Sequence, residues 1–162
     1  MSSITWTPRA VASEAKRRAR RLWRAVEAQH VASTTRLVDD LAEQALLEDI
    51  LEQSKPPLPD EARGLHYLLA TPFRYPPPAR GSRFRSPIDP GVFYGAREQR
   101  TACAELGYWR WRFLCDSPGL THIGPVAQTV FQASVEAPAV DLRQKPFSRD
   151  ARDWTHAESY EA

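Results

Sequence analysis

The sequence has few of the features that mark secreted or membrane-embedded proteins. No apolar run is long enough to cross a bilayer, and the segment from Met1 to Thr7 lacks the charged-then-apolar order of a secretion signal. Only two cysteines occur, Cys103 and Cys115, and lone thiols without a signal peptide are typical of reduced cytoplasmic cysteines. We therefore expect a cytoplasmic protein that does not associate with a membrane.

The common catalytic signatures are also missing. There is no glycine-rich phosphate loop, no zinc-binding histidine pattern on a helix and no paired-cysteine metal motif. The four histidines are far apart in the sequence, so we expect no metal site. Cys103 has few basic neighbours, and a buried structural role is expected for it rather than that of a nucleophile.

What is present fits one folded unit with an unusual distribution of charge. The chain has 162 residues, of which 42% are hydrophobic and 26% charged, and this is enough to bury a core. The net charge is only +2, yet basic residues dominate the first thirty positions and acidic residues the next thirty. Such alternation favours electrostatics within the molecule or with a protein partner over general nucleic-acid binding.

The first sixty residues predict a helical hairpin. Thr7 and Pro8 form a typical helix start, and apolar residues at helical spacing extend the pattern to Val26. A second, acidic helix is expected to begin at Ser33 or Thr34 and to end before Pro56. Its buried side is expected to include Leu41, Leu46 and Ile50. We expect residues 1–60 to be an N-terminal helical extension and residues 61–162 to be the catalytic domain.

Residues 61–162 alternate between strand-like and helix-like patterns. The run 65–69 is short and apolar, and the prolines between 72 and 90 predict that no helix passes through that segment. A short strand is expected at 91–95, a helix from about 98 to 113, and a strand or two within 126–135. The expected core stripe of that helix comprises Ala102, Leu106, Trp109 and Phe113. Together these patterns predict an α+β fold.

Arginines and aromatic residues are interleaved between positions 73 and 112, where no lysine occurs. Arginine grips phosphate oxygens in pairs and stacks on rings, and aromatic side chains stack on bases. The pattern therefore suits single-stranded nucleic acid or a dinucleotide. The arginines are Arg74, Arg80, Arg83, Arg85, Arg97, Arg100, Arg110 and Arg112, and the aromatic residues are Phe73, Tyr75, Phe84, Phe93, Tyr94, Tyr108, Trp109 and Trp111.

Glu105 favours the dinucleotide. It lies beside the apolar stripe of its helix, where we expect it to be only partly exposed. A carboxylate repels a phosphate backbone, but it stabilises the positive charge that develops on a sugar when a glycosidic bond breaks. The alternative, which spacing alone leaves open, is a structural ion pair of Glu105 with Arg83, Arg85 or Arg112.

Three segments together resemble the RES-domain family, the toxins of RES–Xre toxin–antitoxin pairs. They are Gly81-Ser82-Arg83-Phe84, Val92-Phe93-Tyr94 and Thr101-Ala102-Cys103-Ala104-Glu105. The resemblance is strongest over residues 65–115. It implies a fold similar to that of ADP-ribosyltransferases, with a small mixed or antiparallel β core and an attack on NAD as substrate, without a metal.

The resemblance also implies roles for individual residues. Arg83 would hold the NAD phosphates, Tyr94 would pack against the nicotinamide ribose, and Glu105 would stabilise the cation or orient the acceptor. Arg85 is an alternative to Arg83, because the two flank Phe84 and point the same way on an extended segment. Arg74 looks like the family's early strand arginine, and Phe84 and Phe93 complete the expected cofactor-binding set.

The expected function is that of a toxin which cleaves NAD at the nicotinamide–ribose bond and transfers ADP-ribose to a protein, to phosphate or to water. Family members usually continue beyond the position of Ala162, so a more open pocket rim is expected here, which favours a protein acceptor. The expected partners are a cognate Xre-type antitoxin and a target protein, with no direct nucleic acid, and a homodimer is considered. The alternative is a non-enzymatic module that binds RNA or the antitoxin.

Overall fold

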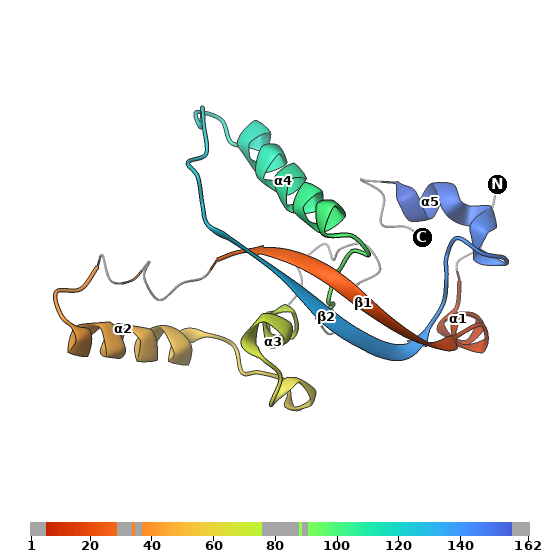
Figure 1. Cartoon of the computed structure of the whole chain (residues 1–162), viewed down its shortest axis with the longest axis horizontal. Coiled ribbons are helices and arrows are strands. Elements are labelled where there is room, and N and C mark those ends of the chain that lie inside the picture. Colours follow the sequence, from red (N-terminus) through yellow and green to blue (C-terminus); the bar gives the residue numbers. More distant parts are fainter. Residues whose placement is uncertain (1–5, 29–33, 35–36, 76–87, 89–90, 157–162) are drawn as a thin grey trace. The chain divides into compact units, whose positions relative to one another are not determined.

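The computed structural model describes residues 6–28, 34, 37–75, 88 and 91–156 (Figure 1). These residues form helices and one two-stranded antiparallel sheet, which confirms the expected α+β class. In chain order the elements are α1 (Pro8–Ser13), β1 (Lys16–Glu27), α2 (Leu41–Ser54), the 3-10 turn η2 (Asp60–Ala62), α3 (Tyr67–Arg74), α4 (Gln99–Asp116), β2 (Gln128–Ala139), the 3-10 turn η3 (Phe147–Asp150) and α5 (Ala151–Thr155).

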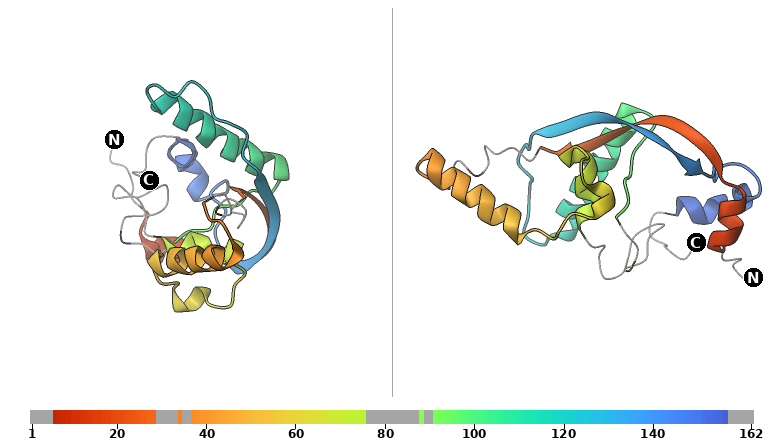
Figure 2. Two further views of the ribbon diagram at one scale, coloured as in Figure 1. Left: turned by 90° about the vertical axis from the view of Figure 1, so that its left-hand side faces the viewer. Right: turned by 90° about the horizontal axis from the view of Figure 1, so that it is seen from below.

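The N-terminal segment begins as predicted and then departs from the prediction. Thr7 caps α1 by accepting a hydrogen bond from the amide of Ala10, and Pro8 occupies the start of the helix. The helix ends at Ser13, and the expected helical continuation to Val26 is wrong, because residues 16–27 form strand β1. Pairing of β1 with β2, more than a hundred residues away, outweighs local helical preference (Figures 1 and 2).

The chain divides into two compact units. One comprises residues 1–21, 76–92 and 134–162, and the other comprises residues 22–75 and 93–133. The expected division at residue 60 into a helical extension and a catalytic domain stays a prediction, although the first of its two helices is replaced by β1.

The first unit is held together by residues near the two ends of the chain. Phe147 is 2% exposed, and its ring lies 4.6 Å from that of Trp6. The indole of Trp6 donates a 2.8 Å hydrogen bond to Asp150, while the Arg149 guanidinium lies 4.7 Å from the Trp6 ring. The indole of Trp154, on α5, donates to the carbonyl oxygen of Phe147. These contacts join Trp6, just before α1, to η3 and, through Phe147, to α5.

Helix α4 of the second unit matches its prediction closely in extent but not in burial. It was expected at 98–113 and spans Gln99–Asp116. Ala102 is buried, as expected, whereas Trp109 and Phe113 are 54% and 61% exposed. The predicted strand near residue 130 is confirmed as β2. The strand expected at 91–95 is wrong: these residues have no regular secondary structure, and the isolated bridge is formed by the next residue, Ala96, with Trp23.

Helix α2 starts later than predicted and turns a different side toward the protein. Asp40, rather than Ser33 or Thr34, caps it by accepting from two amides, and it ends before Pro56 as predicted. The expected buried side is wrong, because Leu41, Leu46 and Ile50 are 85%, 61% and 53% exposed. Gln44 is buried instead, and its amide donates to the hydroxyl of Thr34. The buried side of α2 therefore carries the hydrogen-bonded side chain of Gln44 rather than the apolar side chains.

The apolar run at 65–69, which periodicity left open, begins helix α3. The helix continues to Arg74 and includes Pro72, so the expectation that residues 72–90 exclude helix is wrong at their first positions. Pro72 has no amide hydrogen to bond to the carbonyl oxygen of Leu68, and the helix ends two residues later, at Arg74.

Candidate functional site

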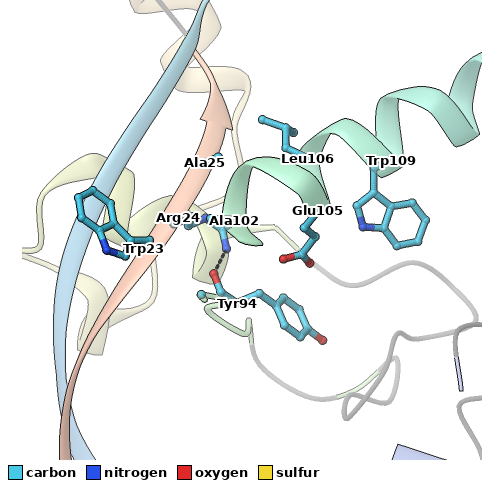
Figure 3. Close-up of a pocket in the computed structure, with 9 residues that line it drawn as sticks. Trp23, Arg24, Ala25, Tyr94, Ala102, Glu105, Leu106 and Trp109 are labelled. Carbon is cyan, nitrogen blue, oxygen red and sulfur yellow. Dashed lines mark hydrogen bonds between the residues drawn. The ribbon is translucent and has the colours of Figure 1, made fainter. Parts of the chain in front are cut away.

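A cavity of about 190 Å³ lies within the second unit, between strand β1, the segment 94–95 and helix α4 (Figure 3). Its lining includes one acidic residue, one arginine and three large aromatic residues. The lining residues are Trp23, Arg24, Ala25, Tyr94, Gly95, Ala102, Glu105, Leu106 and Trp109. Tyr94 and Glu105, both singled out in the sequence, therefore share one cavity.

Glu105 reaches the cavity because it follows the buried Ala102 by three residues, nearly one helical turn. Its carboxylate points toward the space beside Arg24 and Tyr94 (Figure 3). The expectation of partial exposure is wrong: the residue is exposed, since α4 is open on this side. Among the described residues, Glu105 forms no hydrogen bond or ion pair.

The structural ion pair considered for Glu105 is not formed with Arg112, which pairs with Asp116 one turn later at 2.8 Å. The other two arginines considered for it, Arg83 and Arg85, lie outside the described residues. No described residue therefore competes with a ligand for the carboxylate of Glu105.

Tyr94 is positioned by its backbone. Its carbonyl oxygen accepts a 2.7 Å hydrogen bond from Nη1 of Arg24, and its side chain is 37% exposed. The backbone that follows Tyr94 is held to β1 by the bridge between Trp23 and Ala96, whose two backbone hydrogen bonds have N–O distances of 2.7 and 2.8 Å. Gly95 allows the close approach to β1, because a Cβ at this position would lie 3.0 Å from the Cβ of Leu22.

Arg24 is the residue that the sequence interpretation missed. It lies on strand β1, in the segment expected to be a helix, with its guanidinium 5.1 Å from the centre of the Phe93 ring. Its Nε is buried and has no hydrogen-bond partner among the described residues. Burial lowers the pKa of Arg24, and the nearby charge of Glu105 partly opposes this. A single cation inside the apolar run 22–26 was the available signal.

The remaining predicted site residues are distributed differently. Phe93 packs under Arg24 and edge-on to Phe131, with ring centres 6.4 Å apart, and does not line the cavity. Arg74 lies on α3, not on a strand, and it binds Glu52 and the carbonyl oxygen of Pro56, each at 2.6 Å, away from the cavity lining. Arg83, Phe84 and Arg85 lie outside the described residues. The binding roles of all five stay predictions.

The cysteines and other titratable groups add no second centre in the described part of the chain. Cys103 and Cys115 are free thiols, and both are exposed, so the expected burial of Cys103 is wrong. The side of α4 that carries Cys103 is not covered. No cluster of three or more potential metal ligands was found among the described residues. None of the helices described has the length and apolar character needed to cross a membrane.

The arrangement suits the stabilisation of a positive charge. A carboxylate without a partner among the described residues lies beside two exposed aromatic residues, Tyr94 and Trp109, and Arg24 contributes to the cavity wall. Rings can stack on a flat heterocycle, while the carboxylate can stabilise a cation formed next to it.

Comparison with known proteins agrees with this description. Residues 58–162 match the RES domain, a segment that contains both Tyr94 and Glu105 and covers well over half of the chain. A search of curated proteins found no match. The protein therefore belongs to the RES-domain family, which is associated with NAD-consuming toxins of toxin–antitoxin systems.

Proposed function

We propose that this protein cleaves NAD at the bond between nicotinamide and ribose. The observation that carries the proposal is the carboxylate of Glu105, which has no partner among the described residues, in a cavity that also contains Tyr94 and Trp109. Among the described residues, no cation therefore forms an ion pair with this carboxylate that a ligand would have to displace.

The chemistry follows from the charge of the substrate. The nicotinamide ring of NAD is positively charged, so when the bond from its nitrogen to C1′ of the ribose breaks, the electron pair remains with nicotinamide, which leaves as a neutral molecule. The positive charge passes to the ribose as an oxocarbenium-like state. Glu105 stabilises this charge, and a nucleophile then attacks C1′ and loses its proton to solvent.

The rings have a positioning role in this proposal. Tyr94 and Trp109 are 37% and 54% exposed, so their faces are accessible to the nicotinamide ring and its ribose. The cavity volume of about 190 Å³ is below the roughly 300–1,000 Å³ typical of ligand pockets, and it suits one end of the dinucleotide rather than the whole molecule.

A protein side chain is the acceptor that we favour. Arg24 is the only cation among the described residues that line the cavity, and it already binds the Tyr94 carbonyl oxygen and faces Glu105. A free phosphate ion would need a further cation close to C1′. The exposed rim formed by Tyr94, Glu105 and Trp109 leaves room for an approaching protein surface.

The test is incubation of the purified protein with NAD labelled in the ADP-ribose part, alone and in cell lysate, while free nicotinamide is measured. Label in a protein band supports a protein acceptor. Label in ADP-ribose phosphate would identify phosphate as the acceptor instead, and label in free ADP-ribose would identify water. No nicotinamide release under any of these conditions overturns it and favours a non-enzymatic module instead.

We also propose that this protein is a cytoplasmic toxin and that an Xre-type antitoxin neutralises it. Direct RNA binding is less well supported, because several of the arginines considered for it are engaged with acidic residues. Arg74 pairs with Glu52, Arg110 with Glu27 and Arg112 with Asp116. Co-expression with the cognate Xre-type antitoxin should both restore growth and suppress nicotinamide release. Restored growth with unchanged release would contradict neutralisation at the enzyme.

A further inference from the structure

A second cavity lies within the same unit, between strand β1 and helix α3. Its volume is about 230 Å³, and its walls include Arg24, Glu27, Tyr67 and Thr71. Arg24 also lines the cavity that contains Tyr94 and Glu105. One guanidinium is therefore shared by two cavities, each of which is smaller than a typical ligand pocket.

This division matches the construction of a dinucleotide, in which two nucleosides are joined by a diphosphate. A cation in the wall common to both cavities lies where the linking diphosphate would pass. Arg24 lines both cavities, and its buried Nε lacks a hydrogen-bond partner among the described residues. Phosphate oxygens form strong, charge-assisted hydrogen bonds with guanidinium groups.

The second cavity offers groups suited to an adenosine. The Tyr67 side chain is 56% exposed and presents a ring on which a base can stack, and the neighbouring His66 ring lies 4.6 Å from it. Glu27 contributes a carboxylate whose Oε1 is held by Arg110. An acidic side chain in this setting accepts hydrogen bonds from ribose hydroxyls and repels a 2′-phosphate.

We propose that the second cavity binds the adenosine half of NAD, with Tyr67 stacking on the adenine and Glu27 selecting NAD against NADP. Arg24 holds the diphosphate between the two cavities. The inference rests on the proposed function for the identity of the dinucleotide, but not for the existence of the adenosine site, which AMP binding tests without turnover.

The first experiment measures AMP binding by calorimetry and inhibition of nicotinamide release by AMP. Replacement of Tyr67→Ala should weaken AMP binding and raise the KM for NAD about tenfold, while Tyr67→Phe, which keeps the ring, should resemble the parent. Tyr108→Ala is the matched control, since Tyr108 is also exposed but lines neither cavity. Equal AMP binding by the parent and Tyr67→Ala would overturn the inference.

The second experiment compares NAD with NADP as substrates. The parent should prefer NAD, and Glu27→Gln should reduce the preference about tenfold by removing repulsion of the 2′-phosphate. This variant also frees Arg110, whose guanidinium can attract a 2′-phosphate, so the same comparison is made in the Arg110→Gln background, where Glu27→Gln should still lower the preference for NAD. An unchanged ratio would overturn the role of Glu27.

The two proposals fail in different ways. If AMP binds in a Tyr67-dependent manner but no nicotinamide is released from NAD, the proposed cleavage is wrong and the adenosine site stands. If nicotinamide is released but neither AMP binding nor the NAD:NADP ratio depends on Tyr67 or Glu27, the adenosine site is wrong and the cleavage stands.

Discussion

The guanidinium of Arg24 donates a 2.7 Å hydrogen bond to the main-chain carbonyl oxygen of Tyr94. This bond links strand β1, which lies outside the segment matching the RES domain, to a residue inside that segment. The N-terminal strand therefore completes the cavity wall as well as the sheet. Variants at Arg24 should report on the cavity without preventing folding.

We expect Arg24→Met to lower nicotinamide release at least tenfold while the free energy of unfolding changes by less than about 1 kcal/mol. Replacing a desolvated, incompletely paired cation with an apolar side chain of similar length is often nearly neutral for stability. Urea titration and the release assay measure the two effects separately. Arg20→Met, at an exposed position of the same strand, is the control and should leave both unchanged. Full activity of Arg24→Met would exclude a role in the cavity.

Replacement of two glycines with alanine should change the free energy of unfolding in opposite directions. Gly95→Ala should destabilise the protein by about 1–3 kcal/mol and reduce nicotinamide release, because the new Cβ would lie 3.0 Å from Leu22 Cβ and 3.1 Å from Phe93 Cε1. Gly107→Ala, within α4 and with nothing within 4 Å of its Cβ, should gain roughly 0.5–1 kcal/mol. Denaturant unfolding of both variants provides the measurement. A stabilising Gly95→Ala would show that β1 and the Tyr94 segment are not closely packed.

The contact between the two ends of the chain should be the main source of stability in the first unit. Phe147→Ala should cost about 3–5 kcal/mol, because Phe147 is 2% exposed and packs against Trp6. Phe113→Ala, at a position 61% exposed, should change the free energy of unfolding by less than about 0.5 kcal/mol. Similar effects of the two substitutions would contradict this assignment of the core.

Stability should decline in acid partly through Glu52. Hydrogen bonds from Lys55 and Arg74 hold the pKa of Glu52 below its ordinary value of 4.5 in the folded protein. A carboxyl with a lowered folded pKa stabilises above its unfolded pKa, and this contribution is lost as the pH falls through the folded value. Stability curves of the parent and Glu52→Gln should therefore differ at pH 7 and converge as the pH falls below 4.5 and through the lowered folded value. Parallel curves would argue against this linkage.

The sequence predicted those elements whose signals are local. The capped start at Thr7 and Pro8, the end of α2 before Pro56 and the extent of α4 depend on a few neighbouring residues, and all three are confirmed. Strand β1 was missed because its apolar residues fit a helical spacing equally well, and its pairing partner is more than a hundred residues away. Long-range pairing leaves little trace in a single sequence.

The same error concealed part of the candidate site. Arg24 on a helix would have been one of many solvated arginines, whereas on β1 it contributes to a cavity with Tyr94 and Glu105. The exposure of Glu105 and Cys103 was also missed, because the apolar pattern of α4 predicts a buried side that the described fold does not cover.

The most direct test of NAD cleavage by this cavity is nicotinamide release by Glu105→Gln, measured together with NAD binding. Glutamine keeps the shape of the side chain but removes the charge that stabilises the ribose cation, so the rate should fall about 100-fold or more while NAD still binds. Glu98→Gln, at the start of the same helix and outside the cavity, should keep the parental rate. Cleavage of NAD by Glu105→Gln at the parental rate would contradict the account.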